Sequence, residues 1–163
     1  MDILDKVSRY LNQFLIWIGG CFLIIMIVLT CSNIFFRLVS VPIRGTFELM
    51  GFFGALISAF AMGNTQIKGG HIAVDILVLR FTKRTQKVLK CINCFICMVF
   101  FILAAWQIAV YAANLWKTGE VTETLQIIYF PFTYCVALGC ATLALVFLSD
   151  FLKLIFQKKR DET

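Results

Sequence analysis

Four long stretches of the chain carry apolar residues at nearly every position, and short polar segments separate them. They run from about Phe14 to Phe36, about Thr46 to Gln66, about Val88 to Leu115 and about Tyr129 to Phe156. Each supplies the roughly 20 mostly apolar residues that a helix needs to cross the hydrocarbon core of a bilayer. The pattern predicts an all-α integral membrane protein with four transmembrane helices, forming one membrane domain over residues 1–163.

The composition agrees with a bilayer as the solvent. Of the 163 residues, 61% are hydrophobic and the mean hydropathy is +0.90, whereas soluble domains are about 45–50% apolar. The first apolar stretch is longer than the roughly 7–15 apolar residues of a signal peptide, and no small-residue cleavage site follows it. We therefore expect it to remain as a membrane helix.

The basic residues fall unequally on the two sides that four spans define. One side carries 12 of the 15 basic residues, namely Lys6, Arg9, Lys68, Arg80, Lys83, Arg84, Lys87, Lys90, Lys153, Lys158, Lys159 and Arg160. Because cytoplasmic loops are enriched in Lys and Arg, this distribution predicts that both termini are cytoplasmic. Membrane lipids with anionic headgroups account for the basic clusters, and no nucleic acid is expected as a partner.

The loop between the second and third stretches mixes apolar and basic residues over about 71–86. It is too short to span a bilayer, so we predict an amphipathic segment lying along the cytoplasmic membrane surface. His71 and Asp75 within it are four residues apart and would be neighbours on a helix. An interfacial ordering pair is favoured over a proton relay.

The second predicted helix carries a row of small residues. Gly51, Ala55, Ala59 and Gly63 recur at every fourth position, and such a row allows another helix backbone to approach closely in a membrane. The row predicts a helix-packing surface. Whether the packed helix belongs to this chain or to another subunit stays open.

Three charged residues gather near the predicted outer surface. Arg37 and Arg44 flank the first loop, and Glu48 lies in the first turn of the second helix, where the helix dipole favours a carboxylate. Thr46 is predicted to be the N-cap of that helix. We interpret Arg37, Arg44 and Glu48 as contacts for a partner on the outer side, in preference to substrate or proton coupling by Glu48.

Cysteine and histidine suggest no cofactor. Cys91, Cys94 and Cys97 have the C-x2-C-x2-C spacing of some iron–sulfur sites, but on a continuous helix these three side chains point in diverging directions. The only histidine, His71, excludes bis-histidine haem within this chain and argues against a multi-histidine zinc site. We expect no enzyme activity, no metal and no cofactor. An autonomous small four-helix transporter or exporter is the alternative to a partner-binding subunit.

Two patches of the sequence carry a resemblance to a known family. The first comprises Arg37, Pro42-Ile43, Gly45, Glu48-Leu49, Gly70-His71-Ile72 and Val74-Asp75, and the second comprises Gly119, Val121-Thr122 and Thr124-Leu125-Gln126-Ile127. In order and spacing they resemble the small (DctQ-like) subunit of TRAP transporters, the tripartite ATP-independent periplasmic systems. The family often has a proline at the position of Ile128, whereas here Pro131 comes three residues later.

The resemblance implies an accessory role in a bacterial inner membrane. In such systems a periplasmic substrate-binding protein captures a carboxylate and a large membrane subunit moves it with sodium. The small subunit associates with the large one and stabilises it. A C4-dicarboxylate, sialic acid or another sugar acid would each suit such a system, and the sequence does not choose among them.

Overall fold

The computed structural model describes residues 2–39, 41, 43–68 and 83–161. These residues form four long helices, α1 (Asp2–Leu38), α2 (Thr46–Ile67), α4 (Lys83–Thr118) and α5 (Phe130–Asp161). Each contains a stretch long and apolar enough to cross a membrane. The predicted all-α fold with four membrane-spanning helices is therefore confirmed.

The helices extend beyond the apolar windows that predicted them. α1 already begins at Asp2, about three turns before Phe14, because residues 2–18 contain no glycine or proline to interrupt a helix. In the predicted amphipathic segment, residues 71–82 lie outside the described residues, with His71 and Asp75 among them. Residues 83–86 of that segment form the first turn of α4.

The start of α2 differs from the prediction. Thr46 is the first helical residue instead of the N-cap, and Gly45 occupies the cap position with a φ of 75°. The Thr46 hydroxyl donates a hydrogen bond backwards to the Ile43 carbonyl oxygen at 2.8 Å. The prediction of Thr46 as N-cap is wrong because the chain enters the helix through a left-handed residue, a conformation that glycine adopts at little cost.

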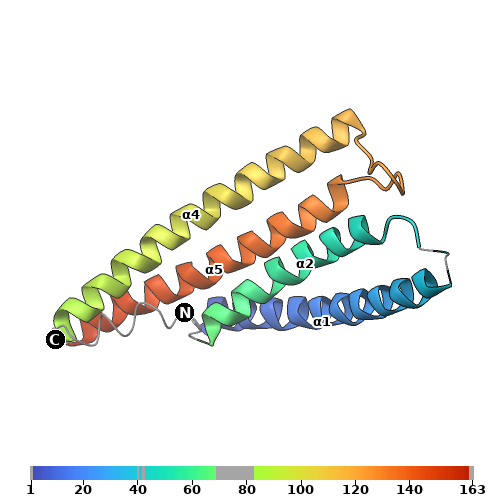
Figure 1. The fold of residues 1–163 in the computed structure, drawn as a ribbon. Coiled ribbons are helices and arrows are strands. Elements are labelled where there is room, and N and C mark those ends of the chain that lie inside the picture. The colour runs from blue at the N-terminus through green and yellow to red at the C-terminus, as the bar shows by residue number, and fades with distance from the viewer. Residues whose placement is uncertain (1, 40, 42, 69–82, 162–163) are drawn as a thin grey trace.

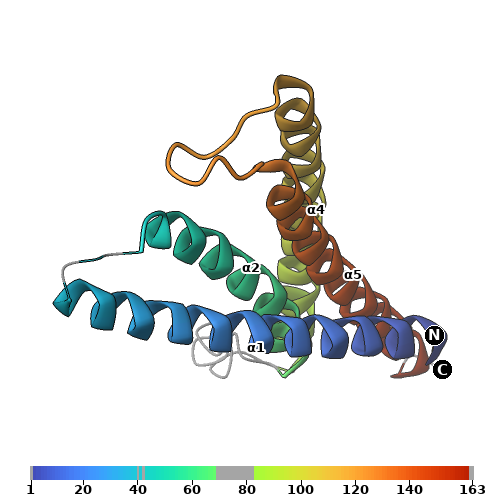
Figure 2. The ribbon, with the colours of Figure 1, turned by 90° about the vertical axis from the view of Figure 1, so that its right-hand side faces the viewer.

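The four helices lie side by side in the order α4, α5, α2, α1 (Figure 1). α5 is the central element, since 44% of its membrane-spanning stretch is buried within the chain, against 6% for α4. The second view shows that the helices spread apart from the end at which α1 begins and α5 ends (Figure 2). The molecule is thus an open layer of two helix pairs, α1–α2 and α4–α5, joined along α2 and α5.

A buried apolar cluster lies where α1, α2 and α5 meet. Leu15, Leu56, Ala59 and Phe60 form its centre, and Phe22 and Phe132 are among the side chains that pack against it. α2 and α5 approach each other closely at Gly139. A Cβ atom placed there would lie 2.8 Å from the Cβ of Ala59 and 2.9 Å from its carbonyl oxygen, so only glycine allows this spacing.

Candidate partner-binding surfaces

The small-residue row of α2 divides into two halves. Ala59 and Gly63 are buried; Ala59 meets Gly139 of α5, and the side chain of Asn12 on α1 fills the space beside Gly63. Gly51 and Ala55 are exposed, and a Cβ atom at Gly51 would meet no atom within 4 Å. One half of the row therefore packs the chain internally, while the other half is left uncovered.

A cavity opens beside the C-terminal half of α2. It has a volume of about 300 Å³ and lies between α2, α4 and α5, with a lining that consists of Ser58, Ala61, Met62, Thr65, Phe101 and Leu143. Most of the side chains that α2 contributes are small. α2 and α4 are not close neighbours (Figure 1), so the surface of the chain is indented between them.

Glu48 is held by the loop that connects α4 to α5. Its Oε1 atom accepts a hydrogen bond from the backbone N–H of Thr124 at 2.8 Å, and Oε2 accepts one from the N–H of Leu125 at 3.2 Å. A carboxylate near the start of α2 thereby binds two successive amides from a segment 76 and 77 residues away. This contact joins the two sequence patches that carry the family resemblance.

Apolar contacts reinforce the same junction. The side chain of Leu125 lies where a side chain at Gly45 would otherwise project, so glycine is needed at position 45 for its conformation and for space. Behind this contact, the Phe52 ring of α2 stacks on Phe132 of α5 with a centroid distance of 4.4 Å and meets Tyr129 edge-on at 5.4 Å.

The connecting loop, residues 119–129, is a compact unit. Val121 and Ile128 form an antiparallel β-bridge. Thr122, only 1% exposed, donates its N–H to the Ile127 carbonyl oxygen at 2.9 Å, and its hydroxyl oxygen accepts the N–H of Ile127 at 3.1 Å. The turn requires positive φ angles at Gly119 (65°) and Gln126 (51°). These bonds close the loop on itself.

The two arginines predicted as outer contacts remain at the surface. Arg37 and Arg44 are both exposed, and within the described part of the chain neither guanidinium has a hydrogen-bond or ion-pair partner. Nearby, the Asn33 side chain accepts the Ile43 N–H at 3.0 Å. The structure thus engages Glu48 within the chain and leaves Arg37 and Arg44 available.

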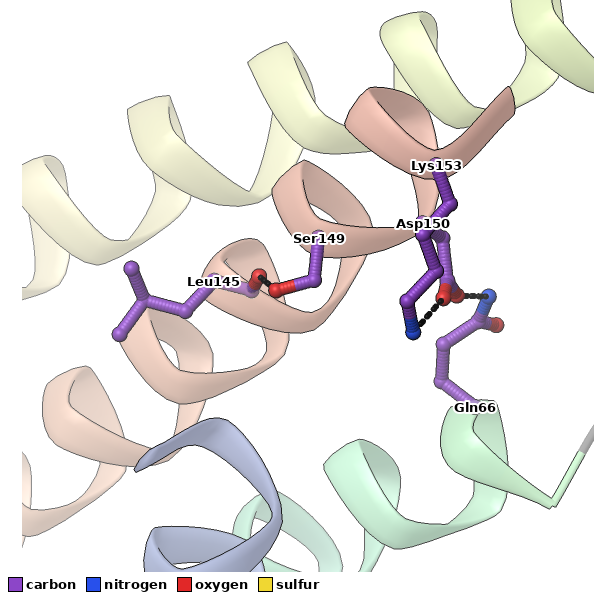
Figure 3. A network of polar contacts seen from close by, with 5 residues as sticks. All are labelled: Gln66, Leu145, Ser149, Asp150 and Lys153. Atoms are coloured by element: carbon purple, nitrogen blue, oxygen red, sulfur yellow. Dashed lines mark hydrogen bonds and ion pairs between the residues drawn. The ribbon is translucent and has the colours of Figure 1, made fainter. Parts of the chain in front are cut away.

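A polar network links α2 and α5 near the opposite end of the molecule (Figure 3). Asp150 and Lys153, three residues apart on α5, form an ion pair with an Nζ to Oδ1 distance of 3.9 Å. Gln66 of α2 donates to Asp150 at 3.2 Å, a contact that the sequence did not suggest because 84 residues separate the two. The partly exposed setting, with 33% of the Asp150 side chain accessible, makes this a modest structural contact.

The sequence pattern also did not predict a buried polar pair on α1. Ser8 and Asn12 are 5% and 1% exposed, and the Asn12 amide donates to the Ser8 carbonyl oxygen at 3.0 Å. Among the described residues, the Asn12 Oδ1 and Ser8 Oγ atoms have no hydrogen-bond partner. The spacing of Ser8, Asn12 and Leu15 places all three on one face of a helix. This spacing indicates a buried face once the helix is taken to begin before Phe14.

The described residues hold no group of three or more His, Cys, Asp or Glu side chains able to bind a metal. Cys91, Cys94 and Cys97 lie on consecutive turns of α4, and all three thiols are free. Their diverging directions on one helix provide no common centre.

Four membrane-spanning helices and large apolar faces that the chain itself leaves uncovered define a multi-pass membrane protein suited to assembly with others. The model of a family described as the DctQ component of tripartite ATP-independent periplasmic transporters matches residues 26–157. The chain belongs to this family and is a small subunit of a TRAP transporter. Neither the curated proteins nor the solved structures contained a match to the chain.

Proposed function

We propose that this chain is the non-catalytic scaffold subunit of a TRAP carboxylate uptake transporter in a bacterial inner membrane. In this role it stabilises the large, sodium-coupled transport subunit, and its outer loops contact the periplasmic substrate-binding protein. Both termini then face the cytoplasm, in agreement with the distribution of basic residues.

The uncovered half of the α2 row is the observation that most supports a scaffold role. Membrane helices associate through close packing of small residues, because lipid already satisfies their apolar surface. Gly51 and Ala55 form such a surface and are exposed within the chain. A helix of the large subunit would pack there, with membrane lipids covering the remaining apolar faces, including most of α4.

The outer arginines support contact with the binding protein. Arg37 and Arg44 are exposed, and a hydrogen bond to Asn33 holds the backbone of Ile43 next to Arg44. Exposed cations on an ordered surface steer and orient an acidic soluble partner more than they add affinity.

Two substitutions in the same row test the scaffold role. Ala55→Leu adds bulk at an exposed position, so the chain alone should melt like the wild type while recovery of the large subunit through an affinity tag on this chain falls. Ala59→Leu adds the same bulk at a position only 6% exposed against Gly139, so it should lower the melting temperature of the chain itself. Wild-type recovery of the complex with Ala55→Leu would contradict the proposed packing surface.

A further inference from the structure

At the end where the two helix pairs diverge, the 119–129 loop bridges them through Glu48, beside the Phe52–Phe132 ring stack between α2 and α5. Figure 2 shows that α1–α2 and α4–α5 diverge toward this end, and that the loop after α4 extends from its own pair toward the start of α2. Any outer surface made by both pairs therefore depends on how the loop is fixed.

Glu48 fixes the loop in one orientation. Both of its carboxylate oxygens are engaged, each by the N–H of a different consecutive residue, Thr124 at 2.8 Å and Leu125 at 3.2 Å. Hydrogen bonds to an ionised acceptor are stronger than those between neutral groups. Two such bonds to adjacent amides define the direction of the loop backbone as well as its distance from α2.

The loop transmits this constraint because its shape is set internally. The Thr122–Ile127 bonds and the Val121–Ile128 bridge close it on itself, and Leu125 seats against Gly45, next to the exposed Arg44. A change at Glu48 should therefore displace the loop as a unit and leave its internal bonds intact.

We propose that Glu48 is a positioning residue that latches the 119–129 loop to α2, so that the outer ends of the two helix pairs present one rigid surface to the binding protein. Glu48 itself then makes no contact with that protein. The latch follows from the geometry of this chain, whereas its effect on the binding protein rests on the proposed function.

Hydrogen exchange tests the latch. In the complex of this chain with the large subunit in nanodiscs, Glu48→Ala should accelerate exchange at the amides of Thr124 and Leu125 by about 10-fold or more. Glu48→Gln keeps one acceptor oxygen and should give a smaller change. Glu123→Gln removes a neighbouring exposed carboxylate that has no partner in the described chain, so it should leave both amides protected. Unchanged exchange in Glu48→Ala would overturn the latch.

Binding of the cognate periplasmic binding protein tests the consequence. On the same nanodiscs, Glu48→Ala should raise the dissociation constant of that protein several-fold while the number of binding sites per complex stays at the wild-type value. A loss of folded complex would instead reduce the number of sites and leave the constant unchanged. Asp150→Asn, at the opposite end of the molecule (Figure 3), is the matched control.

The two readouts separate failure of the latch from failure of the proposed function. Faster exchange together with weaker binding supports the proposal, whereas faster exchange with an unchanged dissociation constant overturns it. If the wild-type complex does not form, or does not bind the protein, the proposed function fails. The exchange measurement then still reports on the latch in the chain alone.

Discussion

Single small residues set the distances between helices in this protein. Gly139 of α5 faces Ala59 of α2 so closely that a Cβ atom would lie 2.9 Å from the Ala59 carbonyl oxygen. Backbone atoms cannot move aside as a side chain can. By contrast, a Cβ atom at Gly54 on α2 would meet nothing within 4 Å.

Gly139→Ala should therefore destabilise the chain although alanine is the better helix former. We expect a loss of about 1–3 kcal/mol, as for other overpacked cores, with a lower melting temperature in detergent by circular dichroism. The control Gly54→Ala should be neutral or stabilising, by up to about 1 kcal/mol. Equal melting temperatures for wild type and Gly139→Ala would show that α2 and α5 do not pack as closely as described.

At the residue scale, the sequence predicted the position of Glu48 in the first turn of a helix but not its hydrogen-bond partners. Its place in the first turn of a helix near the surface was readable, because helix boundaries and apolar windows are local properties. Its hydrogen-bond donors are the backbone amides of Thr124 and Leu125, which lie 76 and 77 residues away in the sequence. Backbone N–H groups carry no side-chain signal, so no motif could point to them.

At the scale of elements, the number and type of helices could be predicted while their ends could not. A window of about 20 apolar residues detects the part of a helix that lies in hydrocarbon, and all four were found. The polar turns beyond it, such as the beginning of α1 at Asp2, obey helix periodicity and propensity instead. The small-residue row likewise predicted a packing face, but dividing it between Ala59–Gly63 and Gly51–Ala55 required the positions of α1 and α5.

The direction of the helices across the membrane is a prediction that reporter fusions can test. Because α1 begins and α5 ends at the same end of the molecule (Figure 1), the positive-inside rule assigns that end to the cytoplasm. A green fluorescent protein fused to the C-terminus should fluoresce, and alkaline phosphatase fused there should be inactive. Phosphatase fused after Gly119, in the loop between α4 and α5, should be active. The reverse pattern would contradict the orientation.

At the scale of the whole molecule, the chain is built to be completed by its surroundings. α5 is the only helix with nearly half of its membrane-spanning stretch buried among the described residues, and the helix pairs diverge toward the end that carries the 119–129 loop (Figure 2). The composition predicted a bilayer environment, but an open layer and a closed bundle of four helices have the same hydropathy profile. Only the arrangement shows how much surface is left for lipid or for another subunit.

Flux measured in liposomes tests the central claim most directly. The substrate should be the labelled carboxylate that the cognate periplasmic binding protein captures. It is supplied under an inward sodium gradient. We predict no accumulation in liposomes that contain this chain alone, and uptake when the large subunit and the binding protein are also present. Carboxylate flux through this chain by itself would contradict a scaffold role and favour an autonomous four-helix transporter.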